Sequence, residues 1–168
     1  MPLLMMPVSC GNPFRDSLAT DLDTKPSQYQ QGKVCRQFAD FLNTDLSAGG
    51  ADYRGTEAQT FFDKPIEWTT TCLPSTTDGI AGTLQVINPR SKGTVEPTDK
   101  NFQATQGFDE KVWLADGNKF RTQVGSWVVE MRISTENIKT PSGTLSMTNE
   151  QTRQAVDFVI GVAREVQG

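Results

Sequence analysis

The chain has 168 residues, 36% hydrophobic and 21% charged, with a formal net charge of −4 and an isoelectric point near 4.8. This length and composition are typical of a single soluble globular domain. The charge argues against nucleic-acid binding, because the 16 lysines and arginines are scattered and form no continuous basic stripe. No internal apolar run approaches the ~20 residues that a membrane-spanning helix needs.

The chain contains no histidine. This excludes Ser–His and Cys–His nucleophilic pairs, histidine-ligated zinc and imidazole acid–base chemistry. Three cysteines also exclude a site with four thiolate ligands. Carboxylate catalysis, a lysine nucleophile and calcium binding remain open, although neither Asp21/Asp23 nor Asp109-Glu110 has EF-hand spacing. We therefore expect a protein that is not an enzyme and has no catalytic residue, metal or cofactor.

The first ten residues, MPLLMMPVSC, are an apolar run that ends at Cys10. The run is typical of the end of an export signal, and Val8-Ser9-Cys10 resembles the end of a bacterial lipobox, whose cysteine is diacylated. We expect residues 1–10 to be a signal remnant, Cys10 to carry palmitate and anchor the chain to the membrane, and residues 11–27 to be a tether. Plain secretion and a cytoplasmic protein with a frayed N-terminus are the alternatives.

The three cysteines bear on the same question. If Cys10 is lipidated, Cys35 and Cys72 remain as an even pair. In an exported protein they could form a disulfide that ties the first helix to the first long strand. The alternative is two buried, reduced thiols that pack as small apolar groups.

Two helices are expected, one near each end of a domain that covers residues 28–168. Apolar residues recur every three or four positions in residues 27–46, and Ser47 to Gly50 provide a stop. The second helix opens with Thr148 and Gln151 at the spacing of a capping box. Its apolar positions are Ala155, Val156, Val159, Ile160, Val162, Ala163 and Val166.

Between the helices the sequence predicts strands. Residues 57–72 are rich in β-branched and aromatic side chains, and residues 79–88 alternate between two faces. Asp116-Gly117 predicts a tight hairpin turn within residues 111–123. In the strand of residues 123–134 one face carries Trp127, Val129, Met131 and Ile133. The order predicts an α+β fold, a curved antiparallel sheet with the N-terminal and C-terminal helices packed on one side.

Residues 89–107 are expected to form a long polar connection, and connections of this length are often functional or mobile. Trp68, Trp113 and Trp127 are the candidate binding residues, although core packing is the default interpretation of a tryptophan in a strand. We expect Trp113 to be the most exposed of the three, because it points away from Val112 and Leu114. The long connection could close over it.

Several of these features occur together in a known group of proteins. Cys10 follows an apolar run, Cys35 lies in the first helix, and Trp68 precedes Cys72. Later come Gly125-Ser-Trp127-Val-Val129 and a helix with Ala155, Val159 and Ala163. This arrangement resembles small cell-envelope lipoproteins of actinobacteria, and also the extracellular sensor domain of mycobacterial receptor-type kinases. The resemblance implies an envelope location and a binding role, and it transfers no catalytic residue.

We therefore expect a non-enzymatic lipoprotein on the outer face of the cytoplasmic membrane, with periplasmic or secreted protein as the alternative. Its partner would be another envelope protein, or an apolar ligand held between sheet and helix. A second hypothesis is an immunity or inhibitor protein that blocks an exported toxin or enzyme with an acidic loop, residues 89–107. A third is a carboxylate-dependent hydrolase.

Overall fold

The structure, a computed structural model, describes residues 26–52, 63–91 and 93–168. The predictions for Cys10, for the signal remnant and for nearly all of the tether lie outside the described residues. The same holds for the first part of the strand predicted over residues 57–72.

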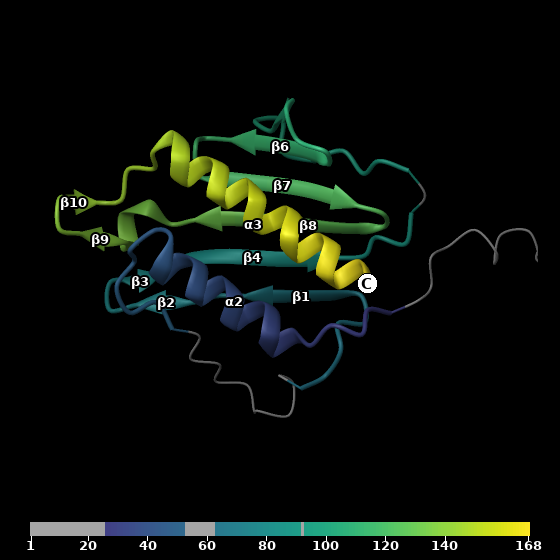
Figure 1. Ribbon diagram of the computed structural model, residues 1–168, viewed down its shortest axis with the longest axis horizontal. Coiled ribbons are helices and arrows are strands. Elements are labelled where there is room, and N and C mark those ends of the chain that lie inside the picture. The colour runs from purple at the N-terminus through teal and green to yellow at the C-terminus, as the bar shows by residue number, and fades with distance from the viewer. Residues whose placement is uncertain (1–25, 53–62, 92) are drawn as a thin grey trace, which may run out of the picture.

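The fold is α+β, as predicted, with both helices on one face of the main sheet (Figure 1). The helices are α2 (Gln31–Thr44) and α3 (Asn149–Gln167), with a short 3-10 turn η1 (Thr135–Asn137). The strands are β1 (Thr69–Cys72), β2 (Ser75–Thr76), β3 (Gly79–Ile80), β4 (Gly82–Ile87), β5 (Gln103–Thr105), β6 (Lys111–Ala115), β7 (Lys119–Val124), β8 (Trp127–Ile133), β9 (Lys139–Thr140) and β10 (Gly143–Thr144).

Six strands form an antiparallel sheet in the order β1-β4-β8-β7-β6-β5. The pairs β2–β3 and β9–β10 form two small separate hairpins. Helix α3 lies over β7 and β8, and α2 lies toward β1 (Figure 1). The core therefore occupies the layer between the helices and the sheet.

Helix α2 buries the predicted stripe, with Val34, Phe38, Phe41 and Leu42 at most 5% exposed. It begins at Gln31 rather than at residue 27, because the preceding segment pairs with residues 64–66 through backbone hydrogen bonds. Residues engaged in such pairing cannot also begin a helix.

Helix α3 begins at the predicted capping box. The Gln151 N–H donates to Thr148 Oγ1 at 3.1 Å, and the Thr148 N–H donates to Gln151 Oε1 at 3.0 Å. Phe158 of α3 stacks on Phe41 of α2 with ring centroids 4.6 Å apart. This aromatic contact links the two helices on the sheet.

The strand predicted over residues 79–88 is interrupted at Ala81. The Ala81 N–H donates to the Pro74 carbonyl at 2.8 Å, so the residue leaves the ladder and the alternation of faces shifts by one position. Ile80 is consequently 46% exposed, whereas Ala81 is fully buried. The continuous alternation predicted over residues 79–88 is therefore wrong before Gly82.

The hairpin at Asp116-Gly117 is confirmed. Both residues have positive φ angles, 54° and 72°, as a type I′ turn requires. A second hairpin joins β7 to β8 through Gly125, with φ 57°, and Ser126. The sequence pattern predicts one continuous strand through this region and therefore misses that turn.

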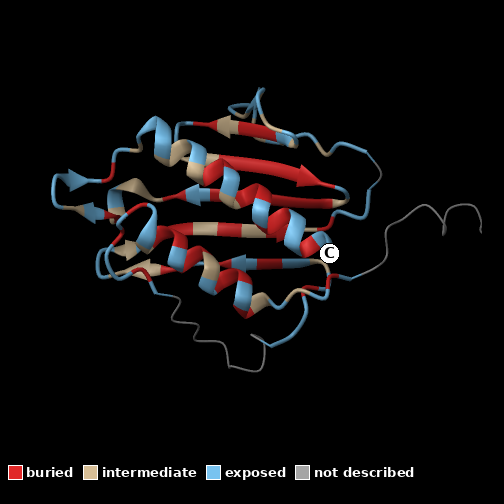
Figure 2. Ribbon diagram, viewed as in Figure 1, coloured by how far each residue is buried: buried red, intermediate tan, exposed pale blue. Residues whose placement is uncertain are grey.

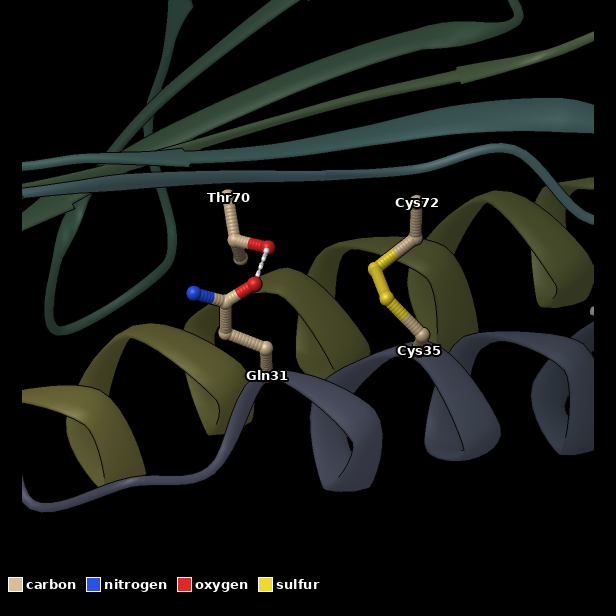
Figure 3. The surroundings of a disulfide bond; sticks show 4 residues. All are labelled: Gln31, Cys35, Thr70 and Cys72. Atoms are coloured by element: carbon tan, nitrogen blue, oxygen red, sulfur yellow. Dashed lines mark hydrogen bonds between the residues drawn. A yellow bond between two sulfur atoms is a disulfide. The ribbon is translucent and has the colours of Figure 1, made fainter. Parts of the chain in front are cut away.

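The predicted disulfide between Cys35 and Cys72 is present (Figure 3). It joins the second turn of α2 to the last residue of β1, and both cysteines are at most 3% exposed. One helical turn earlier, Thr70 Oγ1 donates to Gln31 Oε1 at 3.4 Å (Figure 3). A covalent bond and a hydrogen bond thus hold α2 on the edge strand.

Candidate functional site

The face of the main sheet opposite the helices, here called the back face, is unevenly covered. Strands β1 and β4 alternate between buried and more exposed residues, as expected for a sheet covered on one side only. In β7, every residue from Phe120 to Val124 is buried (Figure 2). A strand buried on both faces needs a second cover, so part of the chain must lie on the back face of β7.

That cover is the segment of residues 93–102, here called the strap. It follows β7 from Gln123, which bonds to Gly93, to Lys119, which pairs with Asp99. The side chains of Thr94 and Lys111 are also hydrogen-bonded. The long polar connection predicted over residues 89–107 is therefore tied to the sheet along residues 93–102, and it leads into strand β5.

Gln123 attaches the strap through both groups of its side-chain amide. Its Oε1 accepts from the Val95 N–H at 2.7 Å, and its Nε2 donates to the Gly93 carbonyl at 2.8 Å. An amide that accepts and donates in this way takes the place of a neighbouring strand's peptide group. It contacts only backbone atoms of the strap, so this contact does not depend on which side chains the strap carries.

Arg121 lies beside Gln123 on the same face and is 8% exposed. Its Nη1 donates to Glu130 Oε2 at 2.9 Å, and its Nη2 donates to the Val95 carbonyl at 3.1 Å. The guanidinium carbon lies 6.0 Å from the centre of the Trp113 ring. The remaining nitrogen, Nε, is buried and has no hydrogen-bond partner within the described ranges.

At the other end of the strap, Lys119 lies between two carboxylates. Its Nζ is 2.8 Å from Asp116 Oδ2 and 3.2 Å from Asp99 Oδ2. Hydrogen bonds to Asp116 and Asp99 raise the pKa of Lys119. The backbone N–H of Asn101, and then Lys119, lower the pKa of Asp99. Both groups are therefore charged at neutral pH and form a solvent-accessible ion pair that attaches the strap to β7.

The chain enters the strap through a strained bend. Arg90 has a φ of 55°, a region that non-glycine residues seldom adopt. Its guanidinium carbon lies 3.2 Å from the centre of the Trp68 ring. The neighbouring Asn88 is 4% exposed, and its Nδ2 is buried without a partner among the residues that the structure describes.

The three candidate tryptophans thus have different surroundings. Trp127 is 2% exposed and belongs to the core beneath the helices. Trp113 is on the back face, as its position opposite Val112 predicts, but the expectation that it is the most exposed is wrong. The strap covers its surroundings, and it is 5% exposed. Trp68, just before β1, is half-buried against Arg90.

Two residues that the sequence interpretation missed define this site, Arg121 and Gln123. The available signal was the alternation in Lys119–Val124, which places two long polar side chains on the same face as Trp113. That interpretation also described residues 89–107 as an acidic loop. The segment carries Arg90, Lys92 and Lys100 against Glu96 and Asp99, a net charge of +1 (three minus two).

Two surface grooves are present, and the first of them borders the end of the strap. One of about 430 Å³ lies at the β6–β7 turn beside Lys100 and Leu114. The other, about 320 Å³, lies between α3 and the loop before β6, beside Phe108 and Ile160. Arg164 crosses the second groove's edge to Glu110 at 3.1 Å. Both grooves are open, and among the described residues that line them there is no cluster of buried polar groups without partners.

A polar cluster joins the two helices. The Tyr29 hydroxyl donates to Glu165, and Gln37 Nε2 donates to the same carboxylate oxygen at 3.0 Å. Burial, followed by the hydrogen bond and charge of Glu165, raises the pKa of Tyr29. Partial burial acts to raise the pKa of Glu165, but the bonds from Tyr29 and Gln37 and the charge of Lys33 lower it overall. We interpret this cluster as structural.

Within the described residues, no helix is long and apolar enough to cross a membrane. No group of three or more cysteine or carboxylate side chains there is arranged to hold a metal ion. Comparison of the chain with models of protein families, with curated proteins and with solved structures found no match.

Proposed function

We propose that the chain is an exported lipoprotein, anchored through Cys10, that binds a partner protein and is not an enzyme. The observation that carries this proposal is the buried disulfide between Cys35 and Cys72. Structural disulfides persist in oxidising compartments outside the cytoplasm and are rare within it. With those two cysteines bonded to each other, Cys10 is left as the unpaired one, at the end of a lipobox-like sequence.

A protein partner is favoured over an apolar ligand between sheet and helix. The layer between them is filled by the core, in which Leu84, Val129 and Val159 have no exposed surface. An apolar ligand would have to displace this packing, because protein interiors contain few voids larger than a water molecule. The back face instead carries Trp113 and Arg121, buried beneath the strap, two residue types that dominate binding energy at protein interfaces.

Lipidation is tested by metabolic labelling with palmitate in cells that express the chain from its native gene. The wild-type protein should incorporate label and Cys10→Ala should not. Cys72→Ala is the matched control, since it also removes one thiol but should keep the label. Persistent labelling of Cys10→Ala would contradict the proposed anchor.

Partner binding is tested with a photo-crosslinking amino acid placed at Arg132 on the exposed part of the back face. Illumination of intact cells should give one discrete crosslinked species, which mass spectrometry identifies. The same group at Asp40, on the exposed side of α2, is the matched control and should give none. The absence of any crosslink from the back face would contradict the proposal.

A further inference from the structure

The strap covers the back face mainly through polar contacts. Its apolar residues Val95, Pro97 and Phe102 are only partly buried, whereas Trp113 and Val128 of the back face are at most 5% exposed. Each hydrogen bond contributes only about 0.5–1.5 kcal/mol net, because water replaces a broken one. A cover held in this way can open locally while the core between sheet and helices stays folded.

Within the described part of the chain, two buried polar groups lack hydrogen-bond partners while the strap is closed, one beneath the strap and one before it. Arg121 is nine-tenths buried and directs an Nε without a described partner into the covered face. Asn88, before the strap, has a buried amide nitrogen in the same condition, next to the strained backbone of Arg90. Buried donors without acceptors are costly. The strap is therefore an imperfect occupant of a face that could bind another segment more completely.

We propose that the back face beneath the strap binds an extended acidic segment of the partner protein, whose carboxylate reaches Arg121 once the strap has moved aside. This inference rests on the proposed function and names the partner chemistry. Gln123 would hold the backbone of the incoming segment as it now holds Gly93 and Val95. A carboxylate at Arg121 would accept a hydrogen bond from the Nε, for which the strap's carbonyl provides no acceptor.

The charge of the back face favours an acidic occupant. Its strands β6, β7 and β8 present the cationic side chains of Lys111, Lys119, Arg121 and Arg132, against the carboxylate of Glu130. Glu130 pairs with Arg121, and Asp116 and the strap's Asp99 pair with Lys119, so the four cationic side chains are neutralised only in part. Complementary charge selects partners and speeds their association.

Strap opening is tested by hydrogen exchange of the Val95 amide, which is bonded to Gln123. The Thr94→Ala/Asp99→Asn variant removes two polar attachments of the strap and leaves the sheet unchanged. We expect the Val95 amide to exchange at least about tenfold faster than the amides of β7, and faster still in this variant. Exchange of Val95 at the rate of β7 in both proteins would show that the strap does not open, and would overturn the inference.

Binding is tested by calorimetry with two synthetic peptides in the strap-weakened Thr94→Ala/Asp99→Asn protein. Both peptides have the sequence of residues 93–102, GTVEPTDKNF, with the third residue changed to Asp in one and to Asn in the other. The Asp peptide should bind about tenfold more tightly than the Asn peptide, since charge-assisted hydrogen bonds are roughly twice as strong as neutral ones. Equal affinities would overturn the proposed acidic specificity.

Added Arg121→Gln should remove the difference between the peptides. Added Gln123→Ala, which leaves Arg121 in place, should weaken both equally. If the Arg121→Gln protein fails to fold, the test rests on the Gln123→Ala protein. Undiminished binding of the peptides to the Gln123→Ala protein would overturn the inference. A concentration-dependent dimer in gel filtration would show that the strap of a second copy fills the back face. That result would also contradict the proposal that a segment of a partner protein binds there.

The crosslinking experiment separates this inference from the proposed function. If Arg121→Gln and Gln123→Ala both reduce capture of the partner, and the strap-weakened protein increases it, the inference holds. If the partner is captured equally by all of them, the protein binds a partner by another route and only the inference fails. If no partner is captured by any of them, the proposed function fails.

Discussion

Cys35 in the second turn of α2 is covalently bonded to Cys72 at the end of the edge strand β1, 37 residues further along the chain. This strand pairs on one side with β4 and carries α2 on its core face. The bond therefore fastens a helix to an edge of the sheet, where hydrogen bonding alone restrains the strand least.

Removal of this disulfide should lower the free energy of unfolding substantially. The chain-entropy model gives about 3–4 kcal/mol for a loop of this length. Guanidinium denaturation of Cys35→Ala/Cys72→Ala should show this loss relative to the oxidised wild type. The wild type in excess reductant is the matched control and should behave like the variant. A difference below about 1 kcal/mol would mean that the bond contributes little.

Two glycines offer a matched pair of substitutions. A Cβ added at Gly82 would lie 2.7 Å from the Arg132 carbonyl oxygen and 2.9 Å from the Phe38 ring. Gly82→Ala should therefore destabilise the protein by about 1–3 kcal/mol through overpacking. At Gly161, in α3, an added Cβ meets no described atom within 4 Å. Gly161→Ala should stabilise it by about 0.5–1 kcal/mol. Thermal unfolding of both variants checks this, and equal effects would contradict the close packing of Phe38 on β4.

Acid should weaken the contact between the helices. The pKa of Glu165 is below its ordinary value of 4.5 in the folded protein. Its contribution is therefore complete above pH 4.5 and is lost as pH falls through the folded-state pKa. Glu165→Gln should flatten the loss of stability with acid below about pH 4.5, measured by urea denaturation at several pH values. If the stability of the Glu165→Gln protein falls with acid as steeply as that of the wild type, Glu165 does not stabilise the contact between the helices.

Tyr29 has the opposite shift and tests the same cluster at high pH. Its raised pKa means that the folded protein keeps the phenolic proton above the ordinary value of 10.0. The contribution is complete below pH 10 and is lost as the pH rises above it. Tyr29→Phe should flatten the alkaline limb and, through loss of the hydrogen bond to Glu165, lower stability at pH 7 by about 1 kcal/mol. If Tyr29→Phe leaves stability unchanged in both pH ranges, the hydrogen bond between Tyr29 and Glu165 does not contribute to the stability of the protein.

The two ion pairs of Arg121 and Arg164 should differ in strength. Arg121 is nine-tenths buried, so Glu130→Gln leaves a buried charge without its carboxylate and should cost about 1–3 kcal/mol. Arg164 has a side chain that is 52% exposed, and Glu110→Gln should cost less than about 1 kcal/mol. Denaturation in 0.1 M and 1 M salt should show that salt weakens the second pair more. The reverse order would contradict the burial of Arg121 beneath the strap.

Features controlled by local sequence were predicted well. The apolar stripe of α2, the capping box at Thr148 and the turn at Asp116-Gly117 all depend on residues close together in the chain. The α+β class followed from their order. The disulfide followed from the number of cysteines, once Cys10 was assigned to a lipid.

Features that depend on distant contacts were not predicted. Ala81 breaks a regular alternation because Pro74 and Ser134, from other segments, bond to its backbone. Trp113 and Arg121 are buried because a segment without periodicity, the strap, lies over them. The polarity of the strap indicated a surface loop. Within the strap, Gln123 bonds only to backbone atoms, and such bonds leave no pattern in the strap's own sequence.

The thiol chemistry of the three cysteines tests the account most directly. The protein should be isolated from its native cells with free thiols alkylated, and its peptides mapped by mass spectrometry without reduction. We predict a linked Cys35–Cys72 peptide and a diacylated Cys10 at the N-terminus of the mature chain. Alkylated Cys35 and Cys72 together with an unmodified Cys10 would contradict both the export and the anchor.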